Sequence, residues 1–322
     1  MIRYSRVVGT GGYLPEEVRT NEQISETVDT SDSWIYERTG IKSRRIAGAH
    51  ESAASMAEIA ARQAIEAAGC DPQTIDLIIV ATGTPDLVYP STGCLLQQRL
   101  GIKNAVAFDV QAACSGSIFA LSIADQYIKS GAAKTVLVVG SEICSRIVDW
   151  TDRGTCILFG DGAGALLLSV TNEPGVLSTH IHSDGDFKDL LYCPLPQTSV
   201  NKNEQEAGYI SMRGNEVFKV AVNTLGRIVD ETLEANNMDR SEIDWLVPHQ
   251  ANIRIIAATA KKLKMPMKQV VVTLETQGNT SSASVLLAFN EAVRDGRIKR
   301  GQVVLLEAFG AGFTWGSALI KY

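Results

Sequence analysis

The chain has 322 residues, of which 45% are hydrophobic and 20% are charged, and its formal net charge is -6. This composition excludes a disordered or fibrous chain, and the negative charge gives no overall basic field that would favour nucleic acid. The apolar stretches are strand-sized, and the N-terminus lacks the apolar region of a secretory signal. We therefore expect a cytoplasmic protein that binds neither nucleic acid nor membrane.

Short β-branched runs alternate with helix-length, Ala-rich segments, a pattern that indicates an α/β fold with a buried sheet. The predicted helices cover residues 52–68, 91–100, 115–130, 216–236, 253–263 and 283–295. The predicted core strands include residues 77–81, 136–140, 165–168, 270–272 and 303–306. The six cysteines form no Cys-x-x-Cys pair, which fits reduced thiols in a cytosolic setting.

An internal repeat is visible in the sequence. Residues 71–79 resemble residues 239–247 at an offset of 168 residues, and each segment follows an amphipathic helix. The helix around Ser117 and the helix around Val285 have the same offset, and each leads into a strand. Because order and spacing are both preserved, the sequence predicts a duplicated α/β unit.

The two halves differ in length near their ends. The final strand pair, at Gly164 and Ser317, has an offset of only 153, so the first half carries about 15 extra residues, which we place around residues 144–158. The predicted halves are residues 1–171 and 172–322. Loops at matching strand ends should meet at the seam between the halves, where we expect a site.

Cys114 follows a strand-like run and precedes a predicted helix. A thiol at a helix N-terminus lies beside unsatisfied N–H groups and the positive end of the helix dipole, which favour the thiolate. The alternative is a buried structural cysteine, the commoner environment. The neighbours of Cys114 are Ala, Ser and Gly, which leave space for a ligand to approach the sulfur. We therefore favour a nucleophile.

His249 and Asn279 are the candidate partners of this thiol. His249 lies at the end of a predicted strand, whereas Asn279 in isolation would be a turn or N-cap residue. The offset of 168 places Cys114 opposite Ser282, so Cys114 and the Asn279 loop should face each other. A Cys, His and Asn set also occurs in papain-like hydrolases, but the Cys-Gly-Ser-Cys-Trp context is missing.

In order and context, four motifs resemble β-ketoacyl-[acyl-carrier-protein] synthase III, a family of the thiolase-like superfamily. The motifs are Ala112-Ala-Cys-Ser-Gly, Val247-Pro-His-Gln-Ala-Asn, Gly278-Asn-Thr-Ser and Gly310-Ala-Gly-Phe-Thr-Trp-Gly. The resemblance implies duplicated α/β halves in a layered αβαβα fold. It also implies a homodimer without cofactor that joins an acyl-CoA primer, which we expect to be acetyl-CoA, to malonyl-acyl carrier protein in bacterial type II fatty acid synthesis.

The resemblance also implies a role for each catalytic group. Cys114 would accept the acyl group as a thioester and release CoA. His249 and Asn279 would donate hydrogen bonds to the malonyl thioester carbonyl and stabilise the enolate left by CO2 loss. The backbone N–H groups of Cys114 and Ala311 would hold the tetrahedral oxyanion.

Further positions match the substrate contacts of the family. Trp34 and Arg153 would sandwich the adenine of CoA, and Arg38 and Asn252 would lie along the same tunnel. Without the family, Trp34 is equally well explained as a surface helix residue. Tyr89 would reach the primer pocket of the partner subunit.

The segment from Trp245 to Leu274 contains no acidic residue, while Arg254, Lys261 and Lys262 contribute positive charge. Such a cluster is ordinarily a solvated helix face. Because it begins five residues after His249, we favour a docking site for an acidic carrier protein.

His180 and His182 alternate on one predicted strand, but no third ligand follows at a metal-site spacing, so we expect no metal. Two other functions stay open at the level of the sequence. One is a secondary-metabolism ketosynthase that uses another acyl donor or a CoA-bound extender. The other is a carrier-binding protein without activity. The sequence leaves open the primer length and branching and any regulation by long-chain acyl products.

Overall fold

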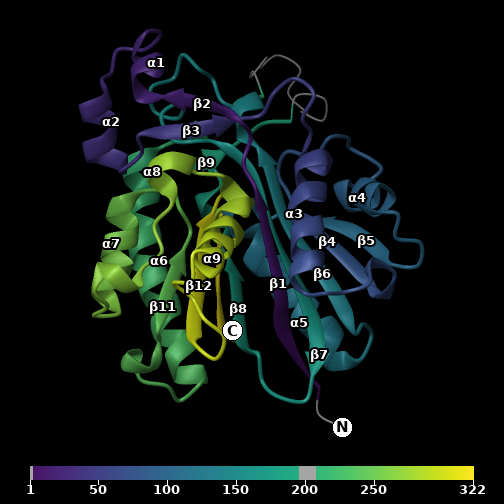
Figure 1. The fold of residues 1–322 in the computed structure, drawn as a ribbon. Coiled ribbons are helices and arrows are strands. Elements are labelled where there is room, and N and C mark those ends of the chain that lie inside the picture. The colour runs from purple at the N-terminus through teal and green to yellow at the C-terminus, as the bar shows by residue number, and fades with distance from the viewer. Residues whose placement is uncertain (1–2, 196–207) are drawn as a thin grey trace.

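The computed structural model describes residues 3–195 and 208–322 (Figure 1). A five-stranded sheet has the order β1-β7-β6-β4-β5, and a four-stranded sheet has the order β11-β12-β13-β8. The first sheet contains β1 (Tyr4–Tyr13), β4 (Leu77–Ala81), β5 (Val106–Val110), β6 (Thr135–Ile143) and β7 (Asp161–Thr171). The second contains β8 (Val176–Ser183), β11 (Trp245–Pro248), β12 (Val303–Gly310) and β13 (Thr314–Lys321). Two small pairs add β2 (Glu17–Thr20) with β3 (Ser43–Ile46) and β9 (Leu191–Tyr192) with β10 (Ser211–Met212).

The helices form three layers around the two sheets (Figure 1). The outer face of the first sheet is covered by α3 (Ala53–Ala67) and α4 (Thr92–Leu100), and that of the second by α6 (Gly214–Ala235) and α7 (Ile253–Lys262). Between the sheets lie α5 (Gly116–Ser130) and α9 (Ser284–Arg294), each in contact with both. This arrangement confirms the predicted layered αβαβα fold.

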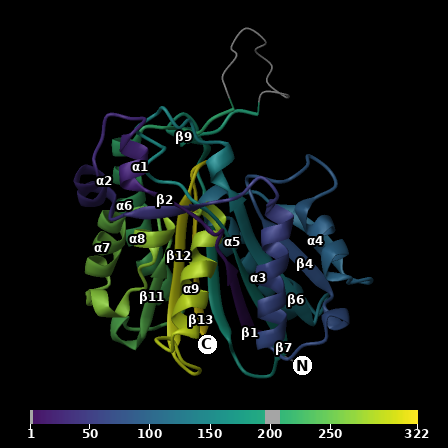
Figure 2. The ribbon, with the colours of Figure 1, turned by 45° about the horizontal axis from the view of Figure 1, so that its top comes forward.

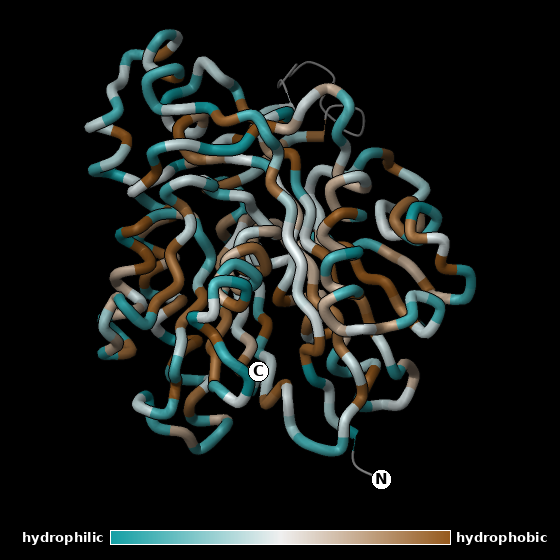
Figure 3. Tube along the Cα trace, viewed as in Figure 1, coloured by the Kyte–Doolittle hydropathy of each residue, from teal (hydrophilic) through white to brown (hydrophobic). Residues whose placement is uncertain are grey.

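The alternation of side chains along the strands explains the layers. On β4, Leu77 and Ile79 pack into the central core with α5 and α9, whereas Ile78 and Val80 pack against α3 and α4. Because successive side chains of a strand point to opposite faces, a run that is apolar throughout must be covered on both sides. In the tube of Figure 3 hydrophobic residues are common along the strands inside the molecule, and hydrophilic residues are common in the outer loops.

Short helices lie at the end of the molecule where the central helices begin. They are α1 (Asn21–Ser25), α2 (Asp32–Thr39) and α8 (Leu274–Gln277). Helix α2 lies beside α7 in both ribbon views (Figures 1 and 2), and the two helices are in contact. None of these three helices is among those predicted from the sequence. Five and four residues are too few for helical periodicity in α1 and α8, and α2 buries only Ile35 and Thr39.

The two halves repeat their elements closely. The short 3-10 helices η2 (Ala113–Ser115) and η8 (Ser281–Ala283) differ by 168 residues, and they lead directly into α5 and α9. The first residue of each adopts a positive φ, 44° at Ala113 and 49° at Ser281. We retain the division at residue 171 as our interpretation of this repeat.

The predicted strand at residues 270–272 is wrong. Only one bridge forms there, between Leu246 and Val270. The side-chain oxygen of Gln250 accepts hydrogen bonds from the backbone of Thr273 at 2.8 Å and of Leu274 at 3.2 Å. The chain therefore turns into α8 instead of continuing along β11.

The described residues include no helix that is both long and apolar enough to cross a bilayer. Nor do they contain three or more His, Cys, Asp or Glu side chains grouped as metal ligands. His180 and His182 instead both contact Glu231, at 3.3 and 2.9 Å.

The buried carboxyl of Glu307 on β12 gives a prediction about stability. Among the described residues neither of its oxygens has a well-formed hydrogen bond, and burial raises its pKa to about 8. The pKa of Glu307 is higher in the folded protein than in the unfolded chain, so the folded protein holds this proton more tightly. The resulting contribution to the free energy of unfolding is complete below the ordinary carboxyl pKa of 4.5. Between pH 4.5 and about pH 8 the free energy of unfolding falls by roughly 1.4 kcal/mol per pH unit, and the contribution is lost above that range.

We therefore expect Glu307→Gln to match the wild type near pH 5 and to exceed its stability near pH 9. Denaturant unfolding at both pH values measures the difference. Parallel loss of stability in both proteins would show that the carboxyl is not held neutral by the fold.

Candidate active site

Cys114 lies in η2, immediately before α5, and its side chain is buried with 8% exposed. Burial raises the pKa of the Cys114 thiol to about 11, although the side chains of Ser281 and Asn279 lie close enough to stabilise the thiolate. A backbone N–H at the helix start also favours the thiolate, as expected from the sequence, but the net shift of the pKa is upward. Removing the sulfur from water outweighs the hydrogen bonds that favour the thiolate.

Asn279 is held by its backbone and its side chain. Its N–H donates to the Leu158 carbonyl at 2.8 Å, and the Gly160 N–H donates to the Asn279 carbonyl at 3.0 Å. The side-chain oxygen accepts the Ser281 N–H at 2.9 Å. With Oδ1 committed to Ser281, the Nδ2 group is the part of the amide that remains to donate toward a substrate.

His249 follows β11 and is buried at the seam. The backbone N–H of His249 donates to the backbone carbonyl of Glu307 at 2.8 Å. The ring nitrogen Nδ1 lies 2.5 Å from the Ser284 hydroxyl in the first turn of α9. Burial lowers the pKa of His249 to about 4, so the imidazole is neutral at neutral pH. Because Nδ1 faces Ser284, the other nitrogen, Nε2, is available for a substrate.

The seam brings these groups together. Helices η2 and η8 are in direct contact, as the repeat predicts, so the Cys114 turn meets the turn that follows Asn279. Gly140 on β6 lets η8 lie directly against this strand, because a Cβ there would lie 2.4 Å from the Ser282 carbonyl oxygen. His249 joins the same cluster through Ser284.

The loop between β12 and β13 brings Ala311 next to the nucleophile. A Cβ on Gly310 would come 2.7 Å from the Cys114 nitrogen, so only glycine allows this approach. The Thr314 hydroxyl lies 3.0 Å from the carbonyl oxygens of both Ala112 and Ala311, which joins the loop to η2. Two backbone segments that could supply oxyanion donors are thereby adjacent.

Glu142, near the end of β6, is a residue that the sequence analysis missed. It is 1% exposed and accepts hydrogen bonds from both Ser281 and Ser282 at 3.1 and 2.8 Å. It also accepts from the Thr84 hydroxyl at 2.7 Å and the Gly83 N–H at 3.0 Å. An acidic residue ending an otherwise apolar strand was the signal that could have revealed it.

Of the residues predicted for CoA, Trp34 and Arg38 lie on α2, Arg153 lies between β6 and β7, and Asn252 lies at the start of α7. The guanidinium of Arg38 lies 4.4 Å from the centre of the Trp34 ring and that of Arg153 lies 4.8 Å from it. Trp34 and Arg153 thus stack directly, and an adenine between them would have to separate them. Asn252 caps α7 through the Arg254 N–H and donates to the Arg38 carbonyl at 3.0 Å.

The basic residues of α7 are exposed but not equivalent. Arg254 lies over the Phe218 ring of α6 at 5.1 Å. Lys262 forms a 2.7 Å ion pair with Asp230 of α6, an acidic neighbour that the sequence of α7 does not reveal. Lys261 is exposed at the same end of the helix.

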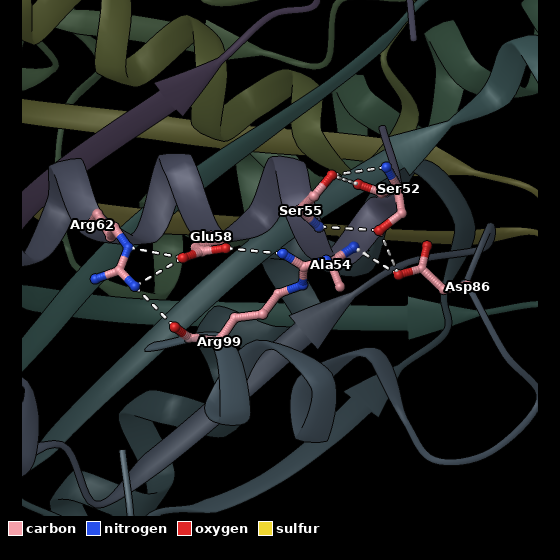
Figure 4. Close-up of polar contacts among 7 residues, drawn as sticks. All are labelled: Ser52, Ala54, Ser55, Glu58, Arg62, Asp86 and Arg99. Atoms are coloured by element: carbon pink, nitrogen blue, oxygen red, sulfur yellow. Dashed lines mark hydrogen bonds and ion pairs between the residues drawn. The ribbon is translucent and has the colours of Figure 1, made fainter. Parts of the chain in front are cut away.

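Tyr89 lies on the loop after β4 and is 83% exposed. The loop is anchored at Asp86, whose carboxylate accepts the Ser52 hydroxyl at 2.9 Å and the Ala54 N–H at 3.0 Å (Figure 4). It also accepts the Ala53 N–H at 2.7 Å. A carboxylate at the start of α3 is favoured by the helix dipole. Tyr89 is therefore presented to solvent by an ordered loop.

A buried thiol, a neutral imidazole, a side-chain amide and two neighbouring backbone segments form a site suited to acyl transfer. Two family models match the chain: 3-oxoacyl-[acyl-carrier-protein (ACP)] synthase III over residues 108–185 and its C-terminal region over residues 233–322.

Curated and solved proteins agree with this match. The beta-ketoacyl-[acyl-carrier-protein] synthase III of Methylococcus capsulatus is 68% identical over 100% of both chains. The solved 3-oxoacyl-[acyl-carrier-protein] synthase III of Aquifex aeolicus is 46% identical with a TM-score of 0.93, covering 99% of this chain and 100% of that one. A solved priming beta-ketosynthase from the R1128 polyketide pathway is 37% identical with a TM-score of 0.93, covering 99% and 96%. The chain therefore belongs to the β-ketoacyl-[acyl-carrier-protein] synthase III family.

Proposed function

We propose that the protein condenses an acyl-CoA primer, acetyl-CoA in the simplest case, with malonyl-acyl carrier protein. The products are a β-ketoacyl-acyl carrier protein, CO2 and CoA, and the reaction initiates fatty acid synthesis. The observation that carries this function is the meeting of Cys114, Asn279 and His249 at the seam. The chemistry uses side chains and backbone amides of the chain and calls for no resident cofactor.

In the first step the Cys114 sulfur attacks the thioester carbonyl of the primer. The tetrahedral oxyanion accepts hydrogen bonds from the backbone N–H groups of Cys114 and Ala311, which the close approach of Gly310 supports. CoA leaves as its thiolate, and the acyl group remains on the sulfur.

In the second step His249 and Asn279 hold the malonyl thioester carbonyl. A neutral imidazole with Nδ1 against Ser284 can donate through Nε2, and the amide can donate through Nδ2. These donors stabilise the enolate that forms when CO2 leaves. The enolate carbon attacks the acyl carbonyl, and the Cys114 thiolate is released with the new carbon–carbon bond formed.

The two alternatives have less support. The polyketide priming enzyme is similar in fold but has lower sequence identity than the Methylococcus capsulatus synthase. A carrier-binding protein without activity has no need of a buried thiol next to two oriented donors.

The six cysteines are all free thiols, which supports a reducing compartment such as the cytoplasm.

The division of roles predicts how the half-reactions separate. Cys114→Ala should form no acyl-enzyme, while His249→Ala and Asn279→Ala should still be acylated but lose malonyl decarboxylation by about 100-fold or more. Mass spectrometry of the acylated protein and CO2 release measure the two steps. Cys94→Ala, which removes another thiol in the first turn of a helix, should retain both. Equal loss of both steps in the His249 and Asn279 variants would contradict the division.

We propose that the CoA adenine enters between Trp34 and Arg153. Arg153 lies on an exposed loop and is held by one bond to the Asp29 carbonyl at 2.9 Å, so it can move aside and stack again on the base. Arg38 would contact the same nucleotide. Asn252 supports this site by tying α7 to the Arg38 carbonyl.

We also propose that the protein is a homodimer formed through the edge of the first sheet. Strand β5 is the last strand of that sheet, and its Val106 is 61% exposed. The loop at Tyr89 adds Leu87 and Val88, which are also exposed. An unpaired strand edge beside exposed apolar side chains favours pairing with a second copy.

If Tyr89 closes the primer pocket of the partner, Tyr89→Ala should change the preference among acyl-CoA chain lengths more than the rate with malonyl-acyl carrier protein. Tyr89→Phe should keep the wild-type order, and Tyr127→Ala, on α5, should have no effect. Rates with a series of acyl-CoAs and analytical ultracentrifugation provide the test. A monomeric wild type, or an unchanged order in Tyr89→Ala, would refute this placement.

The basic residues of α7 are proposed to bind the acidic carrier protein. Arg254→Glu should raise the KM for malonyl-acyl carrier protein about tenfold and change acylation by acetyl-CoA little, because rim charges govern encounter. Lys261→Glu should act in the same direction. Lys262→Glu should have a smaller effect, since Asp230 already pairs with that charge.

The control is Lys134→Glu, the same charge change at the opposite end of β6 from the site. Added salt should weaken the wild-type reaction with the carrier, because charges are screened beyond about 8 Å at physiological ionic strength. If Arg254→Glu changes neither the KM for malonyl-acyl carrier protein nor its salt dependence, α7 does not bind the carrier protein.

A further inference from the structure

Acylation requires that Cys114 lose its proton. Burial raises the pKa of this thiol to about 11, so the sulfur is protonated at neutral pH. In the proposed function His249 and Asn279 act as hydrogen-bond donors, and neither accepts this proton. A nearby group that can accept it would complete the first step.

Glu142 is a buried carboxylate next to this site. One of its oxygens, Oε1, accepts the hydroxyls of Ser281 and Ser282, and the other accepts the Thr84 hydroxyl. In the described part of the chain no Lys, Arg or His side chain forms an ion pair with Glu142. Burial raises the pKa of the carboxyl above its ordinary value, which makes it a better proton acceptor.

Ser281 connects the carboxylate to the thiol. Its hydroxyl donates to Glu142 at 3.1 Å, and the same side chain approaches the Cys114 sulfur. A hydroxyl can donate one hydrogen bond and accept another, so it can pass a proton along. Ser282 differs, because its hydroxyl lies 2.8 Å from both Glu142 and the Ala81 carbonyl oxygen, and the side chains that stabilise the thiolate are those of Ser281 and Asn279.

We propose that Ser281 and Glu142 form a proton relay for Cys114, an inference that rests on the proposed acyl transfer. As the sulfur bonds to the thioester carbonyl carbon, its S–H bond breaks and the proton passes to Ser281 Oγ. The Ser281 proton passes to Glu142 Oε1, and CoA leaves as a thiolate that takes a proton from solvent. In the condensation step the Cys114 thiolate leaves and regains its proton from Glu142 by the reverse path.

Several titratable groups surround Glu142. Cys114 faces it from η2, and Cys144, at the start of the turn after β6, has a pKa raised well above the ordinary thiol value by burial. Asp161 on β7 accepts the N–H and the hydroxyl of Ser145 and has no hydrogen bond to Cys114. His249 is neutral above about pH 4. Glu142 is therefore the acceptor that the hydrogen bonds connect to the sulfur.

The test is the pH dependence of single-turnover acetylation of Cys114 by acetyl-CoA, from about pH 6 to pH 9. With the relay, the wild-type rate levels off within this range once Glu142 is ionised, because Glu142 then takes the proton. Glu142→Gln should be at least tenfold slower near pH 7, and its rate should rise about tenfold per pH unit. If Glu142 only repels the thiolate, the variant would have a lower thiol pKa and react faster near pH 7.

Two serine variants complete the test. Ser281→Ala should show the same steep pH dependence as Glu142→Gln. Ser282→Ala keeps the link from Glu142 to the thiol but loses a hydrogen bond that lowers the pKa of Glu142, so its profile should still level off, at a higher pH than in the wild type. Thermal unfolding establishes that each variant is folded. A wild-type rate that rises tenfold per pH unit over the whole range, or a Glu142→Gln profile equal to the wild type, would overturn the relay.

Failure of the proposed function is recognisable separately, because the wild type would then not be acetylated by acetyl-CoA. In that case alkylation of Cys114 by iodoacetamide over the same pH range tests the relay. A wild-type profile that levels off, with steep Glu142→Gln and Ser281→Ala profiles, is again expected. Steep profiles in all three proteins would exclude the relay.

Discussion

The proposed site depends on the direct contact between η2 and η8, the short helices that precede α5 and α9. Each proposed catalytic group lies on one of these helices, next to one of them, or at the end of a neighbouring strand. This contact depends on small residues. Gly140 leaves room for the backbone at Ser282, and Gly310 leaves room for the backbone at Cys114. A side chain at either position would push the halves apart and separate the nucleophile from its donors.

Burial at this seam has opposite effects on the two titratable catalytic groups. It raises the pKa of the Cys114 thiol and lowers that of the His249 imidazole, because the charged form is disfavoured in both cases. Both groups are therefore neutral near pH 7. A neutral imidazole suits a hydrogen-bond donor for an enolate, whereas a neutral thiol needs a proton acceptor, and Glu142 lies where one is required.

In our interpretation of the repeat, the two halves contribute different groups to the proposed site. At matching positions the first half carries Cys114 and the second carries Ser282, whose hydroxyl binds Glu142 and the Ala81 carbonyl. The segment between β6 and β7 is longer than the one between β12 and β13, and it brings Arg153 to Trp34. This confirms the predicted place of the extra residues and explains why the proposed CoA site lies on one side of the seam.

The sequence by itself determined a duplicated α/β fold with a buried sheet, because apolar periodicity and the repeat at an offset of 168 are properties of the chain alone. Four local motifs pointed to Cys114, His249 and Asn279, and their resemblance to a known family supplied the layered arrangement. The protonation state of Cys114, the pairing of Lys262 with Asp230 and the place of Glu142 were decided only by the tertiary structure. Desolvation and contacts between distant residues depend on what packs around a group, and no local pattern encodes them.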